Sequence, residues 1–252
     1  QGELCTIDNG RTHFTVAPGF SGTVTRWEAG GDNQLLSPYP DRATFGWMSP
    51  WYGGITPIVS TTGSEDFPGK LDQETLAAET VAVTDGGGIP WQGIRLRADL
   101  EREKLLGLSI ALDYLTTGNS NVLQLVARVQ NHTTAARTLV VGWNAFWQLG
   151  GDPTQNVLYG ADTQRRPNPW HSWPRTDHWA AVSNVKTQRT AILVSPYPEA
   201  VGMDWGEPGS HLGWMYKVTV KPEATLTRTA FLVLCGNLVE AKRYVALKDY
   251  QV

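Results

Sequence analysis

The sequence predicts an all-β protein, a large antiparallel β-sandwich formed as a single domain over residues 1–252. Short runs in which apolar and polar residues alternate recur along the chain, as expected for strands with one buried face. Glycine and proline are frequent, with 26 Gly and 15 Pro, and no long stretch shows capped helical periodicity. Many strands joined by short turns, without crossover helices, pack most economically as antiparallel sheets lying face to face.

The expected strands follow one another along the whole chain. They are His13–Val16, Gly22–Ala29, Thr75–Thr84, Gly93–Leu100, Leu105–Leu115, Val122–Gln130, Arg137–Trp147, Asn156–Tyr159, Trp179–Ser183, Ala191–Ser195, Trp214–Val220 and Thr225–Leu234.

Short polar segments separate several of these strands and are expected as hairpin turns. Segment 131–136 would join Val122–Gln130 to Arg137–Trp147 as an antiparallel hairpin, and segment 221–224 would do the same for the last two strands. The glycine run at 85–89 is interpreted as a further turn. By contrast, residues 150–176 hold little strand signal, and a connection of that length in a compact domain is usually functional.

The net charge and the apolar content of the chain exclude some classes of binding partner. A formal charge of −3 and a pI near 6.0 give no basic stripe, so we expect neither a nucleic acid nor a membrane as partner. No apolar run is long enough for a membrane helix, and the first thirty residues carry no signal core, so we expect a soluble chain whose export signal has been removed. The expected location is extracellular or periplasmic, with the cytoplasm as the alternative.

Sequence motifs for cofactors are absent. There is no paired-cysteine motif, no His-x-x-x-His, no Walker loop, no dinucleotide fingerprint and no Gly-x-Ser-x-Gly, so no cofactor and no metal are expected. Two cysteines remain. Because the first and last strands of a sandwich often meet, we expect Cys5 and Cys235 to lie close enough to pair.

Tryptophan is the most unusual component, with 11 residues in the chain. Aromatic rings beside amide, carboxylate and guanidinium groups suit a sugar, which has apolar faces and a rim of hydroxyls. The tryptophans of interest form three groups: Trp47 with Trp51, Trp143 with Trp147, and Trp170 with Trp173 and Trp179, the last beside His171 and His178. The alternative interpretation, that tryptophans fill the core of a large sandwich, applies to any one of them.

Several stretches resemble the galactose mutarotase-like superfamily, a β-supersandwich that also forms a domain of many glycoside hydrolases and polysaccharide lyases. The resembling stretches are Asn9–Val16, Gly22–Trp27, Leu35–Pro40, Trp51–Pro57, Trp91–Leu96, Val129–Thr133 and the closing Val220–Thr225 with Phe231–Val233. The resemblance spans most of the chain and implies the supersandwich fold.

The resemblance also implies where chemistry would lie. Aldose epimerases carry a histidine in an Asn-His-x-Tyr-Phe-Asn-Leu stretch, and the matching run at 143–149 has Asn144 in that place. A neutral amide binds a hydroxyl but transfers no proton. The family's base, a glutamate shortly before the closing hairpin, would be Glu207, with His171 or His178 as the acid.

Two other chemistries stay open at this point. Hydrolysis would require facing carboxylates, for which Glu65, Asp66 and Asp152 are candidates. A polysaccharide lyase would require a base and cations for a uronate, which the segment with Arg165, Arg166, His171, Arg175 and His178 supplies.

We therefore expect a carbohydrate groove on one sheet face, between segments 150–179 and 45–57. The function favoured is carbohydrate binding, as an ancillary domain of a carbohydrate-active enzyme, with a mono- or oligosaccharide and a catalytic domain of the same parent protein as partners. The alternatives are an epimerase-like or lyase-like enzyme using Glu207 and a histidine, and a structural sandwich that binds nothing. The expected ligand-binding residues are Trp47, Trp51, Asn144, Trp147, Arg166, Trp170, Trp173 and Arg175.

Overall fold

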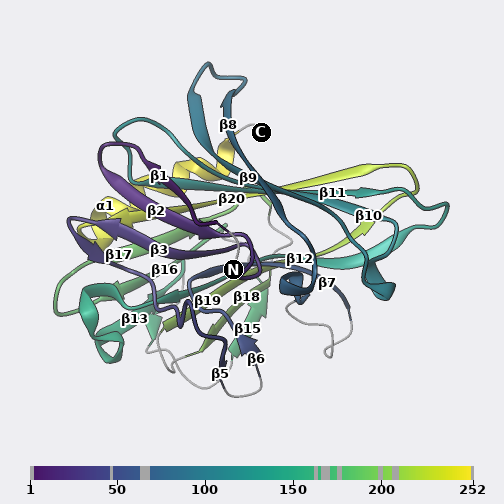
Figure 1. The fold of residues 1–252 in the computed structure, drawn as a ribbon. Helices are drawn as coiled ribbons and strands as arrows, with labels where there is room; N and C mark the ends of the chain where they lie inside the picture. Colours follow the sequence, from purple (N-terminus) through teal and green to yellow (C-terminus); the bar gives the residue numbers. More distant parts are fainter. Residues whose placement is uncertain are drawn as a thin grey trace.

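The computed structural model describes residues 3–45, 48–62, 69–161, 164–165, 171–174, 178–197, 201–205 and 210–250. Two antiparallel sheets lie face to face, and in the described part of the chain each has nine strands (Figure 1). The all-β antiparallel sandwich predicted from the alternating pattern is thereby confirmed.

The first sheet, called sheet I, contains both the N-terminal strands and the middle of the chain. Its order is β1 (Cys5–Asp8), β2 (Thr12–Ala17), β3 (Thr23–Ala29), β7 (Ile55–Thr61), β12 (Arg137–Trp147), β19 (Ser210–Val220), β18 (Val201–Trp205) and β15 (His171–Pro174), with β4 (Asp32–Asn33) paired to β3. The small hairpin of β5 (Ala43–Phe45) and β6 (Met48–Trp51) pairs with neither sheet but packs against Phe146 of β12.

The second sheet, sheet II, is built mainly from the meander that follows residue 76. Its order is β14 (Gln164–Arg165), β13 (Asn156–Tyr159), β16 (Trp179–Asn184), β17 (Thr190–Val194), β20 (Thr225–Cys235), β11 (Val122–Asn131), β10 (Leu108–Thr116), β9 (Pro90–Asp99) and β8 (Ala77–Thr84). The glycine run at 85–89 forms the turn between β8 and β9, as predicted.

Helical structure is confined to short pieces. The described residues contain one α-helix, α1 (Leu238–Arg243), and the 3-10 turns η2 (Leu71–Gln73), η3 (Glu103–Leu105), η4 (Leu149–Gly151), η5 (Pro153–Gln155) and η6 (Tyr244–Asp249). The α-helix starts where the Asn237 side chain accepts the Glu240 amide. It covers an apolar cluster on the outer face of sheet II that includes Trp91 and Phe231. Within the described residues, no helix is long and apolar enough to cross a membrane.

The core lies between the sheets and takes alternate residues of each strand. On β12, Leu139, Val141, Trp143, Ala145 and Trp147 all belong to this core. The Trp147 ring packs against Trp27, with centroids 6.2 Å apart. The residues between them on β12 therefore point to the outer face of sheet I.

The two expected hairpins are wrong. Strands β11 and β12 belong to different sheets, as do β19 and β20, so segments 131–136 and 221–224 both cross from one sheet to the other. Asn131 holds the crossings together at one end of the sandwich. Its Nδ2 donates to the carbonyls of Ala135, at 2.8 Å, and of Val220 and Lys221, both at 3.2 Å. A polar turn looks alike whether the next strand pairs locally or changes sheet.

The expected Cys5–Cys235 proximity is also wrong, because both thiols are free. Cys5 is on β1, paired with β2 at the edge of sheet I. Cys235 ends β20, an inner strand of sheet II, and its side chain packs with the cluster under α1. The first and last strands of this sandwich therefore do not meet through these residues.

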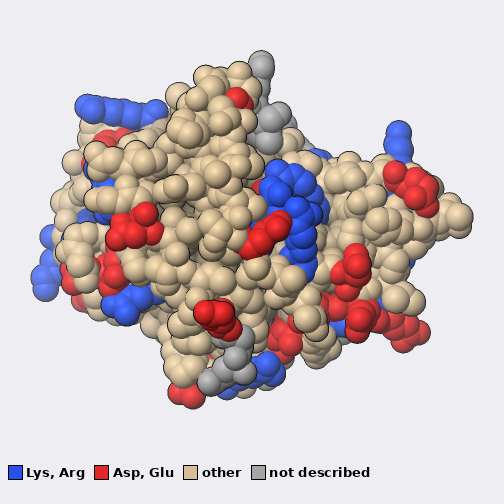
Figure 2. Space-filling view, turned by 45° about the horizontal axis from the view of Figure 1, so that its top comes forward, with Lys and Arg blue, Asp and Glu red and all other residues tan. Residues whose placement is uncertain are grey.

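The segment expected as a long loop, 150–176, has more structure than its composition indicated. Its described parts include η5, β13, β14 and β15, so it adds edge strands to both sheets. On the molecular face shown in Figure 2, acidic and basic side chains lie interspersed.

Candidate functional site

The middle of sheet I presents a polar strip on its outer face. Strands β7, β12 and β19 are neighbours there, and their side chains alternate between the core and this face. Asn144 and Phe146 of β12 point outward, because their chain neighbours belong to the core, and His211 of β19 does so as the neighbour of the core residue Leu212. Gly213, between Leu212 and Trp214, lies on the same outer face.

A buried hydrogen bond joins Asn144 and His211 across the two strands. His211 Nε2 lies 2.9 Å from Asn144 Oδ1, and the two residues are 0% and 2% exposed. The His211 ring stacks on Phe146, with centroids 4.6 Å apart and planes at 20°. Gly213 leaves the room for this arrangement, because a Cβ there would lie 2.7 Å from Asn144 Oδ1.

Burial decides the charge of His211. Loss of hydration lowers the pKa of its imidazole to about 3, so the ring is neutral at pH 7. Since the Asn144 carbonyl oxygen only accepts, Nε2 carries the proton and donates it to that hydrogen bond. A neutral imidazole in this tautomer positions the Asn144 amide and is a poor general acid at neutral pH.

A small pocket, the Asn144 pocket, opens beside this pair. Its walls are Pro50, Trp51, Tyr52, Gly53, Thr56, Asn144 and Phe146. The Trp51 ring meets Phe146 edge to face, with centroids 5.3 Å apart. Within the described residues, neither Trp51 Nε1 nor Asn144 Nδ2 donates a hydrogen bond to the protein. The pocket therefore combines aromatic walls with two donors that have no acceptor among the described residues.

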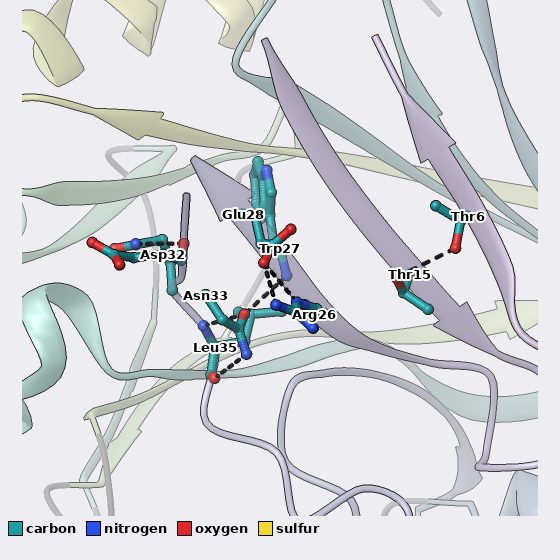
Figure 3. A network of polar contacts seen from close by, with 9 residues as sticks. Thr6, Thr15, Arg26, Trp27, Glu28, Asp32, Asn33 and Leu35 are labelled. Atoms are coloured by element: carbon teal, nitrogen blue, oxygen red, sulfur yellow. Dashed lines mark hydrogen bonds and ion pairs between the residues drawn. The ribbon is translucent and has the colours of Figure 1, made fainter. Parts of the chain in front are cut away.

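A larger hollow, the Tyr39 hollow, lies next to the Asn144 pocket. It has a volume of about 420 Å³ and is lined by Leu4, Thr15, Thr25, Arg26, Asn33, Ser37 and Tyr39. Ser37 connects the two sites, because its Oγ donates to the Tyr52 carbonyl at 3.0 Å. Figure 3 shows Thr15, Arg26 and Asn33 on neighbouring strands, with Arg26 bound to Glu28. Hydroxyl, amide and guanidinium groups thus continue the polar surface away from Asn144.

Two of the predicted ligand-binding residues, Trp51 and Asn144, line the Asn144 pocket, whereas Trp147 lies elsewhere. Trp147, which we expected to bind ligand, is a correction: it is 0% exposed and packs in the core between the sheets. Asn144 and Trp147 are three residues apart on one strand, so their side chains point to opposite faces.

The predicted acids and bases that the structure describes do not line the Asn144 pocket. His178 is half-buried and its Nδ1 lies 2.9 Å from the Ser195 carbonyl oxygen, which ties it to the backbone. His171 and Trp173 are on β15, two strands from β19, and only their backbone is described. Asp152 caps η5, where it accepts from Thr154.

The remaining predicted residues lie outside the described residues. These are Trp47, Glu65, Asp66, Arg166, Trp170, Arg175 and Glu207, while Arg165 is described only in its backbone. In the part of the chain that is described, no three His, Cys, Asp or Glu side chains gather as a metal site.

His211 is the site residue that sequence reasoning missed. A signal existed, because Leu212, Trp214 and Tyr216 alternate with His211 and Gly213, which places the histidine on the outer face. Its partner is 67 residues away in the sequence, and no local pattern pairs β12 with β19.

Solved structures show which fold this is, although the sequence matches no protein-family model and no curated protein. A Klebsiella pneumoniae protein that carries an aldose 1-epimerase assignment superposes with a TM-score of 0.70 at 12% identity, covering 94% of this chain and 80% of that one. A galactose mutarotase-like protein from Lactobacillus casei gives 0.68 at 10% identity, covering 92% and 100%. The α-galactosidase from Lactobacillus brevis gives 0.56 at 11% identity, and 92% of this chain matches 39% of that enzyme. The fold is a galactose mutarotase-like β-sandwich, as the sequence predicted.

Proposed function

We propose that the outer face of sheet I binds a carbohydrate and that the protein acts by recognising the sugar rather than by opening its ring. One observation carries the proposal: the position that the family resemblance gives to a catalytic histidine is Asn144, whose amide is held by a neutral, buried His211. Such a pair offers a fixed donor to a ligand oxygen and no proton to transfer.

The chemistry of the neighbouring walls supports a sugar as the ligand. Asn144 Nδ2 and Trp51 Nε1 supply donors that have no acceptor among the described residues. The pocket beside them, with a volume of about 10 Å³, would admit one hydroxyl group of a sugar whose apolar face lies on the aromatic rim. The hydroxyls of Thr15 and Ser37 line the adjoining hollow, where further sugar rings would find partners. The galactose mutarotase-like fold, shared with proteins assigned to sugar chemistry, agrees with this ligand class.

The second candidate is an epimerase-like or lyase-like enzyme with Glu207 as base. The presence of an imidazole, His211, next to the position of the family's histidine favours it. Against it stands the low pKa of His211, about 3, because an acid for the ring oxygen must be protonated at working pH. His178 is bound to the Ser195 backbone instead of standing free as an acid.

The proposal also covers the role of this chain within a larger protein. The fold occupies 39% of the Lactobacillus brevis α-galactosidase, so such a sandwich occurs within a larger carbohydrate-active enzyme. We propose the same ancillary role for this chain, with a catalytic domain as its partner and an extracellular or periplasmic location.

The test combines a glycan array with calorimetry. For the best glycan, Asn144→Leu is expected to weaken binding about tenfold, the equivalent of one lost hydrogen bond that leaves a ligand group unpaired. Trp51→Phe, which keeps the ring and removes Nε1–H, is a second variant that preserves the wall. Thr138→Val is the matched control, because Thr138 also bonds across β12 and β19, to Thr219, but at the exposed far end.

Polarimetry separates the two candidates. Fresh α-glucose and α-galactose should mutarotate at the spontaneous rate in the presence of the protein. Clear acceleration that disappears in Glu207→Gln would reject the recognition proposal in favour of the enzyme. Binding that is equally tight in Asn144→Leu and in Thr138→Val would show that the sugar site lies elsewhere.

A further inference from the structure

A second cavity, the end cavity, lies at one end of the sandwich. It has a volume of about 280 Å³ and lies where the first residues of β2 and β17 meet the last residues of β3 and β20. It shares no lining residue with the Asn144 pocket or the Tyr39 hollow, so it is a separate site. Its size, just below the usual range for drug-sized ligands, suits a single small molecule.

The charge around the end cavity is positive. Arg11 and Arg189 both line it, and none of its described lining residues carries a carboxylate. Arg189 is anchored, since its Nη1 donates to the Ala29 carbonyl at 2.8 Å. Its ion pair with Asp32 is long and exposed: the Asp32 oxygen lies 3.9 Å from Nη2, and the Asp32 side chain is 79% exposed. The Arg11 backbone amide donates to Asn9 Oδ1 at 2.9 Å, but its exposed guanidinium makes no hydrogen bond or ion pair with any described residue. One guanidinium is therefore fixed and the other is free to close on a ligand.

The cysteine in the wall adds no negative charge. Burial raises the pKa of Cys235 to about 12, so its thiol stays protonated at neutral pH. Glu240, near the rim, is engaged by the Gly236 amide at 2.9 Å. Two arginines thus line the end cavity, whereas the nearby carboxylates of Asp32 and Glu240 belong to residues outside its lining.

Gln34 adds an acceptor that the protein leaves unused. Its side chain lines the end cavity and is 2% exposed, and its Nε2 donates to the Asp32 carbonyl at 2.8 Å, which fixes the amide. Its Oε1 accepts no hydrogen bond from any residue that the structure describes. Asn33 holds this turn, because its Oδ1 accepts from the amides of Trp27 and Leu35, as Figure 3 shows. A buried acceptor without a donor is costly unless a ligand supplies one.

We propose that the end cavity binds a small hydroxylated anion, with its carboxylate or phosphate on Arg11 and Arg189 and a hydroxyl donating to Gln34. Guanidinium groups bind both kinds of anion through paired hydrogen bonds. A sugar acid and a sugar phosphate share this chemistry, and the two are distinguished by titration.

The titration uses four probes on the intact protein: D-glucuronate, D-glucose 6-phosphate, inorganic phosphate and neutral D-glucose. Glucuronate, glucose 6-phosphate or both should bind, and each more tightly than inorganic phosphate, which lacks the hydroxyls. Binding of glucuronate alone assigns a carboxylate ligand, and binding of glucose 6-phosphate alone assigns a phosphate ester. Failure of both to bind at millimolar concentration overturns the proposal.

Three variants locate the binding. Arg11→Gln, which removes no protein contact, should weaken the anionic probes about tenfold, the equivalent of one charge-assisted hydrogen bond. Arg97→Gln is the control, since Arg97 is an exposed arginine of β9 that pairs with Glu79 and lines neither this cavity, the Asn144 pocket nor the Tyr39 hollow. Gln34→Leu should weaken the hydroxylated probes and leave inorganic phosphate unchanged.

The outcomes are separable from those of the sugar-binding face. Asn144→Leu should leave the anion affinities unchanged, so failure of either site does not decide the other. Equal loss in Arg11→Gln and Arg97→Gln would mean general charge attraction and would reject the site. Binding of glucose as tight as that of glucuronate would reject it as well.

Discussion

Acidification should destabilise this protein through His211 well above the pH at which carboxylates titrate. Burial lowers the pKa of His211 to about 3, whereas the unfolded chain titrates near the ordinary value of 6.5. Above pH 6.5 the imidazole is neutral in both states and contributes no pH dependence. Below it, the unfolded chain takes up a proton that the folded protein excludes, so stability falls as pH drops from 6.5 towards 3.

The size of this loss of stability follows from the difference between the pKa of His211 in the folded protein and in the unfolded chain. Each pH unit inside the window costs about 1.4 kcal/mol, so the free energy of unfolding should fall by about 2 kcal/mol between pH 7 and pH 5. Urea denaturation at the two pH values measures it. His211→Gln, which keeps a donor for Asn144, removes the titrating group and should lose about 2 kcal/mol less on acidification than the parent protein.

The comparison of the two proteins isolates His211, because all other titrating groups are shared. An equal loss of stability in the parent and in His211→Gln would refute the reasoning. So would a proton NMR titration in which the His211 ring protonates near pH 6.5 in the folded protein.

Three further predictions concern stability and activity. Gly213→Ala should destabilise the protein by about 1–3 kcal/mol in thermal unfolding, because the new Cβ would lie 2.7 Å from an oxygen, whereas Gly118→Ala, with nothing within 4 Å, should be near neutral. Asp113→Asn should lower the free energy of unfolding in urea by about 2 kcal/mol or more, because this buried carboxylate binds two arginines. Glu79→Gln, in an exposed pair, should lower it by less than about 1 kcal/mol. Equal losses in the two variants would contradict the argument. The protein should not accelerate mutarotation of α-glucose or α-galactose in polarimetry, since the imidazole beside Asn144 is neutral at working pH.

Part of the candidate site was accessible from the sequence. Because side chains alternate along β12, Asn144 points to the face opposite to that of Trp143 and Ala145. The family resemblance singles out the same position 144. The same alternation shows that Trp147 cannot share a face with Asn144, so the prediction that both bind ligand is inconsistent with one strand. Tryptophan content alone therefore overstates the ligand surface, because the core also selects large apolar rings.

The sequence by itself determined most of the long strands, the absence of long helices and hence the antiparallel sandwich, because strand periodicity and turn chemistry are local properties. It did not show β7 (Ile55–Thr61), an inner strand of sheet I. Tertiary structure alone decided which strands pair. Segment 131–136 crosses between sheets because Asn131 binds carbonyls near residue 220, and a contact across 89 residues leaves no local pattern. The bond between Asn144 and His211 and the meeting of Arg11, Gln34 and Arg189 around one cavity have the same origin: packing brings distant residues together only after the sheets have formed.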